Sequence, residues 1–197
     1  MPVRCFGDGD PLYEAYHDEE WGRPVTTERG LFEKVCLEGF QAGLSWSLVL
    51  RRRAALRSAF AGFDPDVLAG WGEAQVAAAL DAPGVIRSRA KVAMVATNAR
   101  ACIELRASGG LADLLWSFAP RGRRAAPKSL AEVPATTPES TAMAVALKKA
   151  GFRFVGATTC YALMQADGLV NDHLAKCPVR KAVEADRVAA RALMAAG

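Results

Sequence analysis

The chain has 197 residues, with 25 lysines and arginines against 21 aspartates and glutamates, and a formal net charge of +4 at pH 7. This length predicts one domain with a substantial core, and the mild positive charge suits a polyanionic partner without requiring one. The sequence contains no secretory leader and no apolar run of membrane-spanning length, which favours a soluble, cytoplasmic protein without membrane contact. Five cysteines, an odd number, argue against a disulfide framework and for reduced thiols or a metal site.

Alanine, leucine and arginine are abundant and alternating β-branched runs are nearly absent, so the sequence predicts an all-α fold, a compact array of helices. Thr26 and Thr27 are typical of a capped helix start, and apolar residues follow at helical spacing. Further helices are predicted, between short breaks with glycine, proline or aspartate, at residues 47–60, 64–71, 72–80, 88–108, 138–150 and 156–166. We expect a basic loop at 119–128, a single domain over 1–178, and a charged, alanine-rich tail over 179–197 that forms a solvated helix.

The two histidines each lie near a cysteine, at opposite ends of the chain: Cys5 with His17, and His173 with Cys177. The second pair is one helical turn apart and would share a helix face. Two thiolates and two imidazoles form a complete tetrahedral zinc set with no open position for water, so such a metal would be structural. The alternative is that these cysteines are small core residues. We predict a core position for the other three: Cys36, Cys102 and Cys160.

A Pro-Gly hairpin at 82–84 separates two predicted helices and is followed by three basic residues. A glycine hairpin that leads into a helix N-terminus presents backbone N–H groups and the positive end of the helix dipole to a phosphate. The pattern looks like a helix-hairpin-helix, which holds the DNA backbone in many repair enzymes. An ordinary turn between two helices with a solvated basic face is an equally good interpretation. The candidate DNA contacts are Gly84, Val85, Ile86, Arg87, Arg89 and Lys91.

Four aromatic residues and one carboxylate gather in the first quarter of the chain: Tyr13, Tyr16, Trp21, Glu38 and Trp46. Aromatic residues at such intervals are usually core, and a helical glutamate is usually a surface charge. Here, however, the segment around the glutamate is mainly apolar, and it carries two glycines that would weaken a helix by about 1 kcal/mol each. These features favour a use beyond packing.

Several longer strings closely resemble the bacterial DNA-3-methyladenine glycosylase I family, from about residue 4 to residue 177. They agree with the family in order and spacing. The strings are Asp10-Pro11-Leu12-Tyr13, Tyr16-His17-Asp18-Glu19-Glu20-Trp21-Gly22, Leu31-Phe32-Glu33, Leu37-Glu38-Gly39-Phe40-Gln41-Ala42-Gly43-Leu44-Ser45-Trp46, Gly151-Phe152-Arg153-Phe154-Val155-Gly156 and Gly168-Leu169-Val170-Asn171-Asp172-His173.

The resemblance implies a helix-hairpin-helix fold that excises 3-methyladenine from alkylated double-stranded DNA, and a structural zinc ion on the two Cys-His pairs. It also implies that Glu38 is the acid of the base pocket, that Tyr16 contacts the base and that Trp46 stacks on it. Tyr13 and Trp21 would then shape the pocket wall. Phe6 stands near the place where the family often has an aromatic pocket contact. By analogy the chain would be a monomer without an organic cofactor.

The residue types suit this chemistry, because methylation at N3 makes the adenine a cation that is already a good leaving group. A carboxylate inside aromatic faces attracts such a cation, at about 0.5–2 kcal/mol for each cation–π contact. Between Gly84 and Asp113 the only acidic residue is Glu104, so the aspartate that related glycosylases place after the hairpin is missing. We therefore expect hydrolysis by water without a Schiff base, and no nucleophile among Lys91, Lys148 and Lys149.

Leu44, between a glycine and a serine, is a candidate wedge for the gap that a flipped nucleotide leaves, with core packing as an even alternative. Two other functions compete with the glycosylase. A non-catalytic sensor of damaged DNA would keep the hairpin and aromatic residues but release no base. A zinc hydrolase would need an open coordination position, which four protein ligands do not leave.

Overall fold

The computed structural model describes residues 4–122 and 124–196, and within them every regular element is a helix. The all-α prediction is confirmed. None of the helices in these ranges is long and apolar enough to cross a membrane. The α-helices are α1 (Pro11–Ala15), α2 (Glu28–Gln41), α3 (Trp46–Ala59), α4 (Pro65–Ala69), α5 (Glu73–Asp81), α6 (Arg89–Leu105), α7 (Gly110–Trp116), α8 (Pro138–Lys149), α9 (Ala157–Ala166) and α10 (Arg180–Ala196). Single turns add the π-helix η1 (Tyr16–Glu20) and the 3₁₀ helices η2 (Ala61–Phe63), η3 (Arg106–Ser108) and η4 (Leu130–Glu132).

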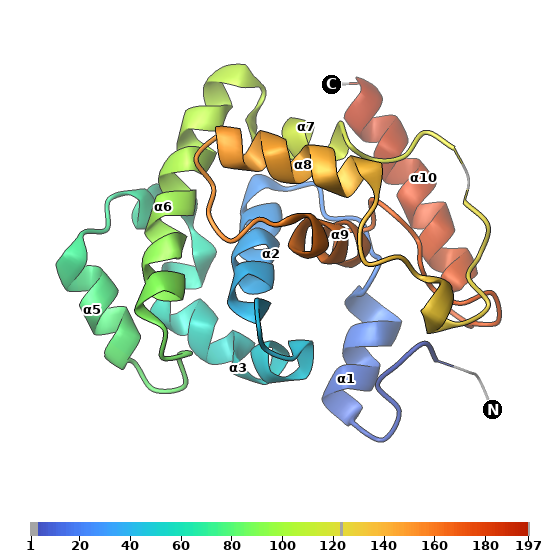
Figure 1. Cartoon of the computed structure of the whole chain (residues 1–197), viewed down its shortest axis with the longest axis horizontal. Helices are drawn as coiled ribbons and strands as arrows, with labels where there is room; N and C mark the ends of the chain where they lie inside the picture. Colours follow the sequence, from blue (N-terminus) through green and yellow to red (C-terminus); the bar gives the residue numbers. More distant parts are fainter. Residues whose placement is uncertain (1–3, 123, 197) are drawn as a thin grey trace.

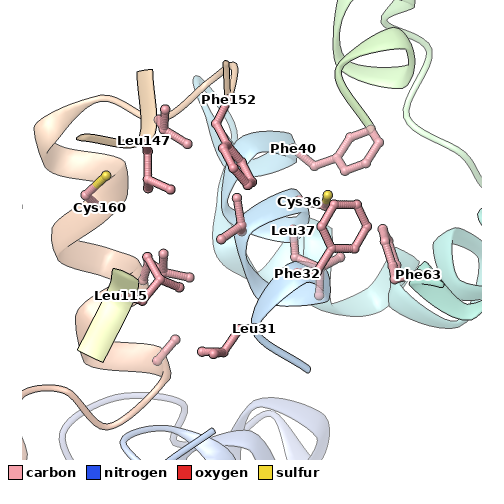
Figure 2. Packing of buried hydrophobic residues seen from close by; sticks show 14 of the residues in the cluster. Leu31, Phe32, Cys36, Leu37, Phe40, Phe63, Leu115, Leu147, Phe152 and Cys160 are labelled. Carbon is pink, nitrogen blue, oxygen red and sulfur yellow. The ribbon is translucent and has the colours of Figure 1, made fainter. Parts of the chain in front are cut away.

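Helix α2 forms the centre of the molecule, with α3, α5 and α6 toward one end and α1 and α10 toward the other (Figure 1). Nine of its fourteen residues are buried. Its apolar side chains pack against residues of α7, α8 and α9 on one side and of η2 on the other (Figure 2). Burial of apolar area at about 25 cal/mol per Å² makes this packing the main source of stability. The labelled core residues are Leu31, Phe32, Cys36, Leu37, Phe40, Phe63, Leu115, Leu147, Phe152 and Cys160.

Several helix starts follow from local capping. Thr27, Ser45 and Thr137 each accept a hydrogen bond from a backbone N–H of the first turn of α2, α3 and α8. Such caps satisfy donors that have no partner inside the helix. The predicted helices agree with α2 to α6, α8 and α9 within a few residues, whereas α1 and α7 were not predicted. The signal for α1 was present, because Asp10 caps it and Pro11 is its first residue.

The predicted hairpin connects α5 to α6, and Gly84 has a φ of 81° at its tip. This left-handed conformation favours glycine. A Cβ atom at Gly84 would lie 2.8 Å from the Cβ of Ala55, so the hairpin also packs closely on α3. The hairpin is therefore rigidly placed on the body of the molecule.

The tail is helical as expected, and it has an exposed outer face and one face that packs on the body of the molecule. In α10, Val183 is fully buried and Arg187 is 6% exposed. Arg187 Nη1 donates to the carbonyl of Leu169 at 3.0 Å, and Arg191 Nη1 donates to Pro120 O at 2.7 Å in the loop after α7. The sequence predicts the helix, but it does not predict the buried face, on which arginine side chains donate hydrogen bonds to carbonyls of loops. The domain boundary at 178 stays a prediction, and residues 1–3, 123 and 197 lie outside the described ranges.

Candidate active site and metal centre

A cavity of about 220 Å³ opens between α1, α2, α3 and α9. Its wall is largely aromatic and contains one carboxyl group. A pocket with apolar walls and a few polar groups is the usual form of a small-molecule site. The lining residues are Phe6, Tyr13, Tyr16, Trp21, Glu38, Gln41, Trp46, Leu130, Val133, Ala162 and Gln165.

The structure brings together all six sequence-predicted pocket residues. The ring centroids of Tyr16 and Trp46 are 5.2 Å apart, and Phe6 lies 4.9 Å from both Tyr13 and Trp21. Contacts between tilted aromatic rings at such distances stabilise the wall beyond their buried area. Phe6 thus occupies the wall position expected for it, although the sequence alone left its register open.

The carboxyl group of Glu38 is almost enclosed. The residue is 4% exposed, and its Oε2 has no hydrogen-bond partner among the described residues. Burial raises the pKa of Glu38 to about 8, while the positive charge of Lys34 acts in the opposite direction. Trp46 Nε1, in the same cavity, also has no partner in the described part of the chain. Unpartnered polar atoms in a cavity indicate a polar ligand, because leaving such groups without hydrogen bonds is costly.

The glycine after Glu38 has a packing role. A Cβ atom at Gly39 would lie 2.6 Å from Met94 Sδ, so any side chain here would require Met94 of α6 to move. Gly43, the second glycine expected to weaken the helix, instead follows its end at Gln41 and has a φ of 74°. Close packing therefore offsets the low helix propensity of Gly39, and Gly43 forms the turn that leads to Ser45.

The two Cys-His pairs meet in one buried cluster, in which the four ligand atoms lie within 4.8 Å of one another. The Sγ atom of Cys177 is 3.4 Å from His173 Nδ1 and 3.6 Å from His17 Nε2, and Cys5 Sγ is 3.6 Å from His173 Nδ1. With zinc–sulfur and zinc–nitrogen bonds of about 2.3 and 2.0 Å, a tetrahedral site separates sulfur from nitrogen by about 3.5 Å. The cluster could hold a metal ion, and its dimensions fit zinc.

Hydrogen bonds around the cluster orient both imidazoles. His17 Nδ1 donates to Asp18 Oδ1 at 2.7 Å, and His173 Nε2 donates to Trp21 O at 2.9 Å. The opposite ring nitrogens therefore point to the cysteines, as in most metal-bound histidines. Burial lowers the pKa of His173 to about 4, which favours the neutral imidazole that binds metals.

The π-helix connects the cluster to the cavity. The backbone N–H of Trp21 donates to Tyr16 O at 2.8 Å, a bond across five residues that widens this turn. Tyr16 then lines the cavity while the next residue, His17, belongs to the metal cluster. Wide turns of this kind often occur at functional sites.

The profile of the family described as methyladenine glycosylase matches residues 6–181. The chain belongs to this family. DNA-3-methyladenine glycosylase 1 of Escherichia coli is 47% identical over 172 residues, which cover 85% of this chain and 91% of that protein. A crystal structure of 3-methyladenine DNA glycosylase I covers 89% of this chain and 98% of its own, with 48% identity and a TM-score of 0.86.

A structure from Staphylococcus aureus, described as the structural basis of 3-methyladenine recognition, has 29% identity and a TM-score of 0.85. It covers 89% of this chain and 95% of its own. The predicted enzyme class, a DNA-3-methyladenine glycosylase, is thereby confirmed. The predicted roles of individual residues stay predictions.

In this glycosylase the hairpin residues divide into two groups. Arg87 and Arg89 are exposed, and Arg89 pairs with Glu73. Val85 is buried beneath them at 8% exposure. The hairpin thus presents exposed cations near the N-terminus of α6, and their contact with phosphate stays a prediction.

Lys91 requires a correction. It was predicted to contact the DNA backbone, but it is only 9% exposed, and its Nζ donates to the carbonyls of Phe40 at 2.8 Å and Ala42 at 2.5 Å. These carbonyls lie at the C-terminal end of α2, where backbone acceptors lack partners inside the helix. Lys91 therefore caps α2 from the neighbouring helix α6 and does not face outward.

Leu44 lies on the turn between α2 and α3 and is 37% exposed. Its N–H donates to the carbonyl of Gln41 at 2.6 Å, which fixes the turn near the rim of the cavity. The structure thus decides against the alternative of core packing. The role of Leu44 as a wedge stays a prediction.

Several residues near the pocket were not predicted. Leu130 and Val133 close one side of the cavity from the segment around η4, and no local pattern in the sequence indicates this. Lys34 and Asp167 are also buried, and both act electrostatically on the groups around Glu38. Lys34 could have been found from its spacing, since residues four positions apart share a helix face.

Proposed function

We propose that this glycosylase binds a flipped 3-methyladenine in the aromatic cavity and releases it by hydrolysis, with the Glu38 carboxylate as partner of the cationic base. The observation that carries the proposal is the enclosed Glu38 carboxyl group, whose Oε2 has no partner among the described residues. The S. aureus relative is described as recognising this base. In a water-poor site, the attraction between a carboxylate and a cation is stronger than in bulk solvent.

The reaction breaks the bond between N9 of the base and C1′ of the sugar. The electron pair of that bond goes to the base, which leaves as neutral 3-methyladenine. Water forms the new bond to C1′ and gives up a proton to solvent. Glu38 holds the edge of the base, while the faces of Tyr16 and Trp46 enclose it. Each aromatic contact with a cation contributes about 0.5–2 kcal/mol.

Hydrolysis is favoured over a Schiff base because no lysine occurs among the described residues that line the cavity. Lys91 holds the end of α2, and Lys148 and Lys149 lie exposed on α8. A nucleophilic amine must reach C1′, and none of these is placed at the cavity wall. We infer a monofunctional enzyme that leaves the strand intact.

We further propose that double-stranded DNA binds across the hairpin and the α2–α3 turn to a single copy of this chain. Arg87 and Arg89 would contact phosphates, and Leu44 would fill the gap left by the flipped nucleotide. Extrusion of a base costs a few kcal/mol, least for a damaged base. The exposure of Leu44 and of both arginines supports this arrangement.

We propose that the metal is zinc, held by Cys5, His17, His173 and Cys177. The sulfur–nitrogen separations near 3.5 Å and the oriented imidazoles support this assignment. Four protein ligands leave no position for a substrate, so zinc would join residues near the two ends of the chain. No reaction step passes through it.

The test is base release from N-methylated duplex DNA, followed by chromatography, for the wild type, Glu38→Gln and Glu104→Gln. Glu104 is an exposed carboxylate on α6 and serves as the matched control. We expect release of 3-methyladenine, a loss of about 100-fold in Glu38→Gln, typical of a lost charge-stabilising contact, and no loss in the control. Binding of alkylated DNA without release by the folded wild type would instead support the damage sensor.

A further inference from the structure

Lys34 is a buried cation one helical turn before Glu38. Both residues belong to α2, and at a spacing of four they lie on the same face of the helix. Lys34 is 7% exposed, its Nζ pairs with Glu20, and it lies 5.5 Å from the ring centroid of Tyr16. An ammonium group in such surroundings must be compensated by nearby negative charge.

Glu20, from the π-helix, is the first of these negative charges. It also accepts two hydrogen bonds of 2.6 Å from Arg53 Nη1 of α3. Burial acts to raise the pKa of Glu20, but Lys34 and Arg53 more than offset it, and the pKa falls below its usual value. Glu20 is therefore a carboxylate, shared by two cations.

Asp167, directly after α9, is a third carboxyl group in this region. It is fully buried, and neither side-chain oxygen has a hydrogen-bond partner among the described residues. Burial raises its pKa well above the usual value; Lys34 opposes this, while Glu38, Glu20 and Glu33 add to it. Its position is fixed, since Val25 N–H donates to Asp167 O and the next residue, Gly168, packs against the backbone of Pro24.

The charges in this region are nearly balanced. Lys34 and Arg53 contribute two positive charges, and Glu20 contributes one negative charge. Glu33, also on α2, is paired with Arg57 of α3 at 2.8 Å. The pKa values of Tyr13 and Tyr16 are raised, chiefly by burial, so both phenols stay neutral. One further carboxylate can be accommodated, and the two candidates are Glu38 and Asp167.

Geometry distinguishes the two candidates. Glu38 lines the cavity, where water or a bound base can stabilise its negative charge. Asp167 does not line the cavity and is fully buried, with its backbone held against the segment that precedes α2. A second carboxylate so close would disfavour the first, as in any pair of neighbouring acids that share one site.

We propose that Lys34 is a positioning residue for this reaction: its ammonium group is the counterion that lets Glu38 become a carboxylate when a cationic base enters, while Asp167 keeps its proton. The proposal rests on the proposed function of Glu38 and adds the group that controls its charge. When the cation binds, Glu38 gives its proton to solvent, so the net charge of the region is the same before and after binding. A neutral purine gains no such attraction, so Lys34 contributes to selectivity for alkylated bases.

The test uses two small probes, the cation 3,9-dimethyladeninium and the neutral 9-methyladenine, whose binding is followed by the fluorescence of the pocket tryptophans. Binding is measured against pH for the wild type, Lys34→Met, Lys34→Arg and Asp167→Asn. In the wild type, affinity for the cation should rise with pH through the pKa of Glu38, about 8. Lys34→Met should move this midpoint up by about one unit and weaken cation binding about tenfold below it.

Lys34→Arg should restore most of the wild-type profile, and Asp167→Asn should leave the midpoint unchanged because it replaces one neutral group by another. Three results would overturn the proposal: an unchanged midpoint in Lys34→Met, an equal loss of the neutral probe, or a lower midpoint in Asp167→Asn. The result for Asp167→Asn tests the proposal even if Lys34→Met does not fold. Binding of the probes does not require base release. If the protein fails to excise a base from DNA, the proposed function is contradicted, but the proposal for Lys34 is still tested by the binding measurements.

Discussion

Replacement of Lys91 by methionine should destabilise the fold and leave the electrostatic part of DNA binding unchanged. The variant removes two hydrogen bonds from a charged donor, to Phe40 O and Ala42 O. Hydrogen bonds that involve a charged group contribute about 1.5–3 kcal/mol each. Phe40 is buried, so its carbonyl stays without a partner, whereas Ala42 is exposed and its carbonyl can bind water.

The expected loss is therefore close to that of one such bond, about 2 kcal/mol. For a chain of this size it corresponds to a fall in melting temperature of roughly 4–8 °C. Methionine also avoids the free-energy cost of burying an ammonium group. The loss of stability should therefore be smaller than the summed contributions of the two hydrogen bonds. Denaturant unfolding of the wild type and the variant, fitted with one common slope m of free energy against denaturant concentration, measures this loss of stability.

Arg87→Met is the matched control, since it removes an exposed cation four residues earlier, on the hairpin. It should cost less than about 0.5 kcal/mol of stability, as most surface substitutions do. If Arg87 contacts a phosphate, the slope of log binding constant against log salt should become shallower by about 0.9. Lys91→Met should not change that slope. A shallower slope together with unchanged stability in Lys91→Met would refute the burial argument.

Two further predictions concern the wedge and the metal. Leu44→Ala should lower base release from duplex DNA by about tenfold or more, because the gap left by the flipped nucleotide is not filled. It should leave binding of the small cationic probe intact, because Leu44 does not line the cavity. An equal loss in both measurements would contradict the wedge. Elemental analysis should find one zinc ion per chain. Cys177→Ser should lower the metal content, and it should lower the free energy of unfolding by several kcal/mol. If the metal-free protein unfolds with an unchanged free energy, the structural role of the metal is contradicted.

The sequence was most informative where function depends on residues close together in the chain. The mainly apolar segment from Leu37 to Trp46 is notable in the sequence for its carboxylate and two glycines, and Glu38, Leu44 and Trp46 lie around the end of α2 in the structure. The Cys-His pairs were also recognisable, because few residue types bind zinc and the two pairs complement each other. Only the fold, however, shows that they meet.

Sequence patterns failed where the direction of a side chain decides its role. Lys91 follows two exposed arginines and resembles them in type, yet the rotation of α6 turns it inward to the end of α2. Asp167 is a single acidic residue directly after α9, and no sequence pattern indicates its complete burial. The packing of α10 depends on contacts with loops far away in the sequence, which periodicity alone cannot reveal.

The π-helix has a consequence for how this enzyme can vary. Each residue in a helix rotates the following side chains by about 100°, and a π turn holds one residue more than an α turn. Deletion of one residue from Asp18–Glu20 would restore regular α-helix, but it would rotate Trp21 by about 100° relative to Tyr16 and His17. Trp21 could then no longer line the cavity and accept the hydrogen bond from His173 in its present position. Natural and engineered variants should therefore tolerate changes of chain length in the loop at 119–128 far better than in this turn.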